Sequence, residues 1–396
     1  MAVNAAARPK VSFRPGNLPR PINLWLYGAK SAAHGGGAEE RACNMAQGAA
    51  SAPAPRQLVA DEVRPSDQDP PQRRDSHRHT YGALDLGTNN CRLLIARPND
   101  HGFTVIDAFS RIVRLGEGLA LSGALSDDAM DRAVSALAVC SDKLRRRNVS
   151  LVRSVATEAC RRATNGAAFA ERVRVETGIA LDIIPPQEEA RLAVLGCHRL
   201  LEPGDGPALI FDIGGGSTEL VLIDQDDGVP RIRSWFSAPW GVVSLTESEG
   251  REALEGPDRI KAYKRMRERA RHAFARFAAM LPEERDGIRL LGTSGTVTTL
   301  ASVHLALPAY DRRAVDGLHI PTEAMQNISN MIASMDYEER IALPCIGSDR
   351  ADLVVAGCAI LEAIIEIWPA PNLGVADRGI REGILRSLMA RDGWPL

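Results

Sequence analysis

Residues 208–223, ALIFDIGGGSTELVLI, have the spacing in this chain that most clearly suggests chemistry. Two apolar, strand-like runs flank Asp212 and three glycines, which predicts two paired strands joined by a glycine turn. The glycines at 214–216 lack Cβ atoms, so backbone N–H groups can approach an anion closely, and the hydroxyls of Ser217 and Thr218 add donors. The turn therefore predicts a phosphate-binding loop. A glycine-rich hairpin without a ligand is the alternative.

Asp212 stands at the end of the first of these strands and faces the same anion. A carboxylate about 4 Å from a phosphate oxygen costs roughly 4 kcal/mol at an effective dielectric constant near 20. A divalent cation or a proton is therefore expected between the two negative charges.

A second copy of the pattern, YGALDLGTNNCRLLI, occupies residues 81–95. Aligning Asp85 with Asp212 gives an offset of 127 residues (212 − 85) and also brings Gly87 onto Gly214. Each copy opens a segment of domain size. The sequence therefore predicts an internal duplication, with two phosphate loops that face each other across a cleft.

The elements that must position these loops are predicted in the same order twice. The first half has the pattern βββαβαβα, including a strand at 151–156. The second half repeats three strands and continues with a long helix at 260–281 and a strand at 288–291. Segment 309–348 shows no clear pattern, whereas the wide apolar face at 353–365 predicts a buried helix.

Composition restricts the class of protein. A chain of 396 residues exceeds one ordinary core, so two domains are expected. With 45% hydrophobic and 25% charged residues and a net charge of −2, it resembles a cytoplasmic protein that binds neither DNA nor membranes. The seven cysteines include no CxxC pair, which indicates reduced thiols. A homodimer is left open.

Residues 1–79 differ from the rest of the chain. They are rich in Pro, Gly, Ala and Ser, and their 11 Lys/Arg against 7 Asp/Glu give +4. We predict a disordered extension, with a start site assigned too far upstream as the alternative explanation. The remainder divides into a first lobe at 80–204 and a second at 205–396, whose C-terminal helix could pack back on the first lobe.

Three further stretches have polar residues where ligands often bind. Glu158 and Arg161 follow a strand, and open α/β sheets bind ligands at the carboxyl ends of their strands. Glu188 and Glu189 begin a helix, which the helix dipole alone can explain. Residues 292–295 follow another strand and open a helix, so they offer N–H groups to a further anion, with an ordinary glycine turn as the alternative.

Several catalytic motifs are missing. The chain has no Walker GxxxxGK[ST], no HExxH, no GxSxG and no His/Cys set with metal-ligand spacing. Hydrolytic chemistry would therefore fall to carboxylates and a divalent metal.

Six motifs together resemble the exopolyphosphatase and guanosine pentaphosphate phosphohydrolase (Ppx/GppA) family of the actin, Hsp70 and sugar-kinase superfamily. They are DLGTNNCRLL, VATEACRRATN, EEARLAVLG, FDIGGGSTELVLI, PWGVVSLTE and GTSGTVTTLA. The resemblance implies an α/β fold of two duplicated ribonuclease-H-like lobes, as in actin-like ATPases, around an inter-lobe cleft. It also implies dependence on Mg²⁺ (or Mn²⁺) and release of terminal phosphate from inorganic polyphosphate, or of the 5′-γ-phosphate from guanosine pentaphosphate. The chain is similar to the short, two-lobe form.

The resemblance places the catalytic glutamate at Glu158. We expect Asp85, Asp212 and Glu189 to hold Mg²⁺ directly or through waters. The predicted phosphate-binding residues are Gly87, Thr88, Asn89, Asn90, Arg92, Arg161, Gly214, Gly215, Gly216, Ser217, Thr218, Gly292, Thr293, Ser294 and Gly295.

Two positions depart from the family pattern. Asn90 stands where a small hydroxyl residue is common, and Pro185-Pro186 replaces the usual Ser-Gly before the paired glutamates. Two other functions stay open. A sugar-kinase-like ATP phosphotransferase shares both loops but needs an adenosine pocket and a sugar site. A non-catalytic sensor would bind guanosine polyphosphates without releasing phosphate. Because the loops recognise phosphate, the sequence does not separate polyphosphate from guanosine pentaphosphate.

Overall fold

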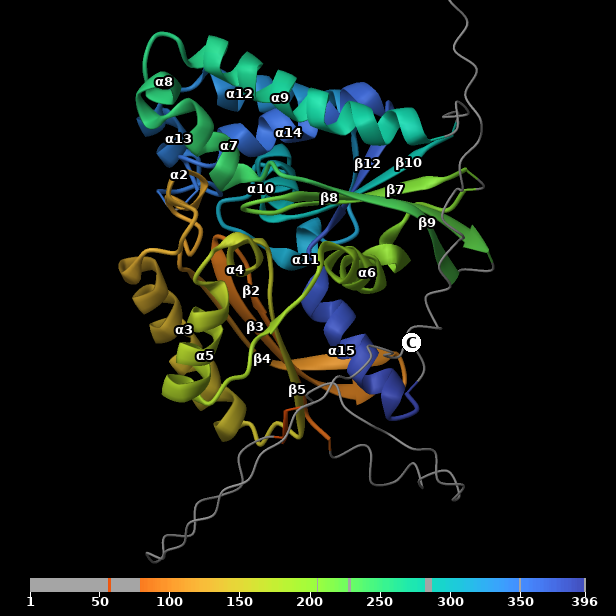
Figure 1. The fold of residues 1–396 in the computed structure, drawn as a ribbon. Coiled ribbons are helices and arrows are strands. Elements are labelled where there is room, and N and C mark those ends of the chain that lie inside the picture. The colour runs from red at the N-terminus through yellow and green to blue at the C-terminus, as the bar shows by residue number, and fades with distance from the viewer. Residues whose placement is uncertain are drawn as a thin grey trace, which may run out of the picture.

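Two six-stranded mixed sheets, each with helices packed on it, make up the folded chain (Figure 1). This computed structural model describes residues 56–57 and 79–394, apart from 205, 227–228, 282–286 and 349. The predicted disordered extension at 1–79 lies outside the described residues, except for His79 and for Arg56–Gln57, which form the short strand β1. Within the described part of the chain, no helix is long and apolar enough to cross a membrane.

The first sheet has the strand order β1-β5-β2-β3-β4, with β6 paired to β5. Strands β2, β3 and β4 form an antiparallel meander, and β5 lies parallel to β2 on its other side. The strands are β2 (Tyr81–Leu86), β3 (Asn90–Asn99), β4 (Gly102–Ile112), β5 (Leu151–Ala156) and β6 (Asp182–Ile183). Strand β6 is short, because only two of its residues pair with β5 at the sheet edge.

The second sheet has the order β11-β12-β10-β7-β8-β9. Strands β7, β8 and β9 form the matching meander, and β10 lies parallel to β7. The strands are β7 (Ala208–Ile213), β8 (Thr218–Asp226), β9 (Val229–Ala238), β10 (Arg289–Thr293), β11 (His319–Pro321) and β12 (Asn372–Ala376).

The two meanders are copies in detail. Asp85 and Asp212 occupy the same position, one residue before the end of the opening strand of each hairpin. The pairing of the second and third strands shifts register after Ile95 in one copy and after Leu222 in the other. These bulges have the same offset of 127 residues (222 − 95). A shared bulge at a shared offset confirms the predicted duplication.

Helices of the first lobe begin and end at the expected signals. Ser126 caps α3, because its hydroxyl accepts the N–H of Ala129 at 3.3 Å, and Gly178 ends α5 in the left-handed conformation. The short helix α4, which starts at Glu158, was not predicted. The helices are α2 (Leu119–Ser122), α3 (Asp127–Arg146), α4 (Glu158–Arg162), α5 (Gly166–Thr177) and α6 (Pro186–Cys197), with a 3-10 turn at His198–Leu200.

Helices of the second lobe pack around α14, whose residues are all buried except the last two, as the apolar face predicted. The stretch 309–348 holds three helices and one strand of three residues, and only one of these helices, at Thr322–Ser334, is longer than two turns. The helices are α7 (Val242–Glu249), α8 (Arg251–Glu255), α9 (Arg259–Met280), α10 (Gly295–His304), α11 (Arg312–Val315), α12 (Thr322–Ser334), α13 (Tyr337–Ala342) and α14 (Val354–Ile367).

The last helix, α15 (Ile380–Arg391), packs on β2 of the first sheet and crosses α6 (Figure 1). The crossing is close because glycines lie at it. A Cβ on Gly196 would lie 2.0 Å from the carbonyl oxygen of Gly379, and one on Gly383 would lie 2.0 Å from that of Leu192. Ile384 and Leu385 are buried in the same cluster as strands of the first sheet, so this helix completes the first lobe's core.

We expect Gly196→Ala to lower the free energy of unfolding by about 1–3 kcal/mol, since the added methyl group must push α6 and α15 apart. Urea denaturation would measure this. Ser387→Ala on α15 is the control and should change stability by less than about 0.5 kcal/mol. Equal stabilities for Gly196→Ala and the wild type would contradict the close crossing.

Candidate active site

A cleft between the two hairpin loops brings most of the predicted site residues together. The glycine loops at 87–90 and 214–217 both line it, one from each sheet. The predicted residues that line the cleft are Asp85, Gly87, Thr88, Asn89, Asn90, Arg92, Glu158, Glu189, Asp212, Gly214, Gly215, Gly216, Ser217, Ser294 and Gly295.

Four residues predicted to bind phosphate do not line this cleft, namely Arg161, which is described below, and three residues on strands. The buried hydroxyl of Thr218 donates to a backbone carbonyl at 2.7 Å, and that of Thr293 does the same at 2.6 Å. Gly292 instead lies against Phe211, whose ring a Cβ at that position would approach to 2.7 Å. All three are strand residues, and each faces other parts of the protein rather than the cleft.

Both loops close by the same hydrogen bond. The N–H of Gly87 donates to the carbonyl of Asn90 at 2.9 Å, and the N–H of Gly214 donates to that of Ser217 at 2.9 Å. These turns reverse the chain tightly and fix the orientation of the peptide groups between them.

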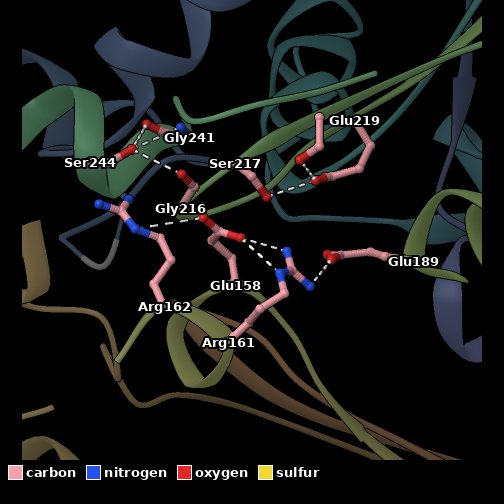
Figure 2. Close-up of polar contacts among 10 residues, drawn as sticks. Glu158, Arg161, Arg162, Glu189, Gly216, Ser217, Glu219, Gly241 and Ser244 are labelled. Atoms are coloured by element: carbon pink, nitrogen blue, oxygen red, sulfur yellow. Dashed lines mark hydrogen bonds and ion pairs between the residues drawn. The ribbon is translucent and has the colours of Figure 1, made fainter. Parts of the chain in front are cut away.

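In the second loop, the N-terminus of α7 holds the carbonyl groups from behind. The N–H of Val243 donates to the carbonyl of Gly215 at 2.8 Å, and the hydroxyl of Ser244 donates to that of Gly216 at 3.2 Å (Figure 2). Since C=O and N–H point to opposite sides of a trans peptide group, the N–H of Gly216 is turned away from α7. Among the described residues it has no hydrogen-bond partner.

The first loop is held in the same way by the residues that follow β4. The carbonyl of Thr88 accepts the N–H of Gly116 at 2.9 Å, and that of Asn89 accepts the N–H of Val113 at 2.9 Å. Each loop therefore has its carbonyl oxygens tied back, which leaves N–H groups for an anion in the cleft.

The glycines of the second loop also let the two loops touch. A Cβ on Gly215 would lie 2.9 Å from Cβ of Thr88, and one on Gly216 would lie 2.8 Å from its Oγ1 and 3.0 Å from Cγ of Glu158. The sequence analysis explained these glycines by the close approach of an anion to the backbone, and the structure adds a second reason. They also allow Glu158 of one lobe to lie against the phosphate loop of the other.

Glu158 is the first residue of α4, directly beyond β5, and only 13% of its side chain is exposed. Its Oε2 accepts hydrogen bonds from Nη2 and Nε of Arg161 at 2.5 and 3.1 Å (Figure 2). Its other oxygen lies 3.8 Å from Nε of Arg162. Two guanidinium groups thus fix the orientation of this carboxylate.

Arg161 was predicted to bind phosphate, but the structure directs it elsewhere. Its Nη1 donates to Oε2 of Glu189 at 3.2 Å and to the carbonyl of Ile184 at 2.7 Å. Because it also pairs with Glu158, its donors are used by the protein, and it does not line the cleft. Arg161 joins the two glutamates into one unit.

Buried carboxylates concentrate negative charge beside the loops. Burial, and then the charge of Glu219, raises the pKa of Asp212 to about 8. Burial and Glu219 also raise the pKa of Glu189. Burial raises the pKa of Asp85, whose Oδ1 is buried without a hydrogen-bond partner. These groups need positive charge to be ionised together.

The residues present fit a hard divalent cation. Their donors are carboxylate oxygens, and Oδ1 of Asp85 is an unused buried acceptor. Within the described chain, no cluster of three or more His, Cys, Asp or Glu side chains is arranged to hold a metal ion. Mg²⁺ prefers oxygen ligands, usually keeps several waters, and binds through one or two carboxylates and substrate phosphates.

Glu219 lies beside the cleft and raises the pKa of Asp212 and Glu189, although its sequence position predicted no role for it. It is buried on β8 and accepts hydrogen bonds from the hydroxyls of Ser217 at 2.7 Å and Ser237 at 2.9 Å (Figure 2). Ser217 and Glu219 are two residues apart and therefore share one face of the strand. This alternation was a signal that could have identified Glu219.

Arg350 is a second residue that was missed. It lines the cleft opposite Arg92, and its Nη1 donates to Oγ1 of Thr299 at 2.6 Å. Burial, and then the charge of Arg381, lowers the pKa of Arg92. The cleft thus holds positive charge as well as carboxylates. Nothing in the sequence singled out Arg350, because it lies in a turn after the segment without periodicity.

Comparison with known proteins identifies the family to which the chain belongs. The sequence profile of the Ppx/GppA phosphatase family matches residues 94–392. The chain belongs to the Ppx/GppA phosphatase family. The resemblance drawn from the six motifs is therefore confirmed, and with it the actin-like fold of two duplicated lobes.

The similarity to individual relatives extends over nearly the whole length of each relative. A Mycobacterium tuberculosis protein named exopolyphosphatase 2 is 30% identical over 322 residues, which are 77% of this chain and 97% of that protein. The crystal structure of the Aquifex aeolicus member of the Ppx/GppA family is 30% identical, with a TM-score of 0.65 over 79% of this chain and 98% of that one. An exopolyphosphatase from Cytophaga hutchinsonii, 22% identical, shares the fold with a TM-score of 0.67 over 79% and 98%.

The raised pKa of Asp212 predicts how the metal-free Ppx/GppA protein responds to pH. Its folded pKa is about 8, against an ordinary value of 3.8, so the folded state binds this proton more tightly than the unfolded state. The resulting stability is fully present below the unfolded pKa and is lost as pH rises through the folded one. We therefore expect the melting temperature to fall progressively between about pH 4 and pH 8, the interval between the two pKa values.

Asp212→Asn should make that fall shallower, because asparagine does not titrate. Differential scanning fluorimetry in a chelating buffer would compare the two proteins across the pH range. Equal slopes in the wild type and in Asp212→Asn would mean that another group causes the pH dependence.

Proposed function

We propose that this Ppx/GppA protein is a Mg²⁺-dependent exopolyphosphatase that releases terminal orthophosphate from inorganic polyphosphate. The observation that carries the proposal is the opposed pair of loops, whose carbonyls are tied back, with Glu158 at their contact. A relative 30% identical is named exopolyphosphatase 2, which supports the same substrate.

Binding would use both loops at once. Backbone N–H groups of the two turns, with the Thr88 hydroxyl and the Arg92 guanidinium, would neutralise phosphate oxygens at the end of the chain. Donors fixed in advance need no reorganisation when charge develops at the phosphorus. A polyphosphate end held by both lobes would place its terminal phosphorus beside Glu158.

Glu158 would act as the general base. Its carboxylate takes the proton from a water that attacks the terminal phosphorus in line, and the shortened polyphosphate leaves from the opposite side. Arg161 and Arg162 hold the carboxylate from behind, so its orientation does not depend on the substrate. Positioning of this kind is the main contribution that a protein makes to phosphoryl transfer.

Asp85, Asp212 and Glu189 would hold the Mg²⁺ (or Mn²⁺), in part through waters. When bound, the cation supplies positive charge that offsets the carboxylates and the phosphate oxygens. The raised pKa values of these groups support this role, because the metal-free cluster retains protons instead.

Guanosine pentaphosphate is the second candidate substrate. Its 5′-phosphates offer the same chemistry to the loops. Apolar side chains against which a guanosine could pack also line the cleft, namely Ile112, Val242, Leu353, Val354 and Ile380.

The test is release of orthophosphate from tripolyphosphate, long polyphosphate, guanosine pentaphosphate and ATP in parallel, each with and without Mg²⁺. We expect release from polyphosphate that stops when the metal is chelated. Phosphate transfer from ATP to a sugar would instead favour a sugar-kinase-like phosphotransferase. Tight nucleotide binding without release of phosphate would favour a non-catalytic sensor of guanosine polyphosphates.

Glu158→Gln tests the mechanism. The amide keeps the size of the side chain but removes the base, so kcat should fall by roughly 10²- to 10⁴-fold while KM changes by only a few-fold. Steady-state kinetics at saturating Mg²⁺ would measure both constants.

Glu189→Gln is the contrasting variant and should raise the Mg²⁺ concentration needed for half-maximal activity. Retention of more than about a tenth of wild-type kcat by Glu158→Gln, far above the expected range, would remove Glu158 as the base.

A further inference from the structure

Two polar contacts join the lobes on one side of the cleft, and both start from the residues between β4 and α2. We call this segment, Val113–Gly118, the bracing loop. The N–H of Gly118 donates to Oε1 of Glu247 at 2.8 Å, and Nη2 of Arg114 lies 3.1 Å from Oδ2 of Asp352. Both acceptors belong to the second lobe.

The bracing loop also shapes the first phosphate loop. The N–H of Gly116 donates to the carbonyl of Thr88, and those of Val113 and Arg114 donate to the carbonyl of Asn89 at 2.9 and 3.0 Å. One short segment therefore ties back the carbonyls of one phosphate loop and contacts the opposite lobe.

The first lobe holds the bracing loop from behind through Arg132 of α3. Its Nε donates to the carbonyl of Val113 at 2.9 Å, and its Nη2 donates to that of Arg114 at 3.2 Å and to Glu117 at 2.7 Å. Arg114 itself has φ of 48°, a left-handed conformation that a side chain disfavours. An arginine in this conformation indicates that the surrounding contacts determine it.

On the second lobe, both acceptors lie next to elements that line the cleft. Glu247 belongs to α7, whose N-terminus ties back the second phosphate loop. Asp352 is two residues from Arg350, which lines the cleft. One oxygen of each carboxylate, Oε2 of Glu247 and Oδ1 of Asp352, is buried with no hydrogen-bond partner in the described structure. An unpaired buried carboxylate oxygen costs free energy, so the contact that each carboxylate makes with the bracing loop helps to offset the cost of burying it.

We infer that Arg114 and Glu247 are positioning residues for phosphate release. They hold the bracing loop against α7 and Asp352, and thereby fix the distance between the two phosphate loops. The inference rests on the proposed function, because it assumes that both loops grip one phosphate chain. Loss of either contact would let the lobes separate at the contact between Glu158 and Gly216.

Activity and stability should respond differently if these residues position the loops. Arg114 is 39% exposed, and exposed ion pairs contribute little to the free energy of folding. Small misplacements of catalytic groups, in contrast, reduce rates strongly. A purely structural contact would affect both properties only slightly.

The experiment compares Glu247→Ala and Arg114→Ala with two matched controls, using tripolyphosphate at saturating Mg²⁺. Glu247→Gln keeps a carbonyl oxygen that can accept the Gly118 N–H. Arg147→Ala removes an arginine that is 49% exposed, against 39% for Arg114, and that pairs with Asp107 inside the first lobe. We expect each test variant to lower kcat/KM by roughly tenfold, the value of one hydrogen bond, with melting temperatures near that of the wild type. Both controls should stay within about twofold of wild type.

Hydrogen exchange provides a readout that does not depend on activity. Peptides covering the bracing loop and α7 should exchange faster in Glu247→Ala than in wild type or in Glu247→Gln. If Glu247→Ala does not fold, the half-exposed Arg114→Ala gives the same comparison. Wild-type kcat/KM in both test variants, or unchanged exchange in α7, would overturn the inference. Absence of phosphate release by the wild type would contradict only the proposed function, and the exchange comparison would still test the contact.

Discussion

The structure depends on holding several negative charges close together, so their electrostatic repulsion must be offset by positive charge nearby. Asp85 and Glu189 are buried and Asp212 is half-buried within one cleft, and the substrate proposed for it is itself a polyanion. Backbone dipoles and guanidinium groups are sources of opposite charge, and the proposed divalent cation would add to them. The glycine loops, the arginines around Glu158 and the duplicated hairpins all serve this electrostatic requirement.

Sequence reasoning reached the parts of the site that follow from local chemistry. Glycine after a strand-end aspartate predicts a turn. The second copy of this pattern, 127 residues away, predicts that the same turn is present in both lobes. Glu158 was noted because it follows a predicted strand, and the resemblance to the family supplied its expected catalytic role. These features need only the residues themselves and the periodicity of the strand beside them.

The remainder depends on contacts between segments far apart in the chain. Arg161 was expected to bind phosphate, yet it pairs with Glu189, 28 residues later. Arg350 lies in a turn with no pattern of its own, and the bracing loop acts through residues of the other lobe. Thr218 and Thr293 have the right chemistry, but their hydroxyls donate to backbone carbonyls of residues far along the chain. Spacing in the sequence does not carry this information.

The placement of α15 also sets the order in which the molecule can be completed during synthesis. Ile384 and Leu385 fill one part of the first lobe's core, and Ile384 follows the last residue of β5 by 228 positions (384 − 156). Tyr81 of β2 donates a hydrogen bond to Asp392, which directly follows α15. The sheet of the first lobe is therefore translated well before the helix that covers one of its faces, and that apolar face stays uncovered until α15 has been made.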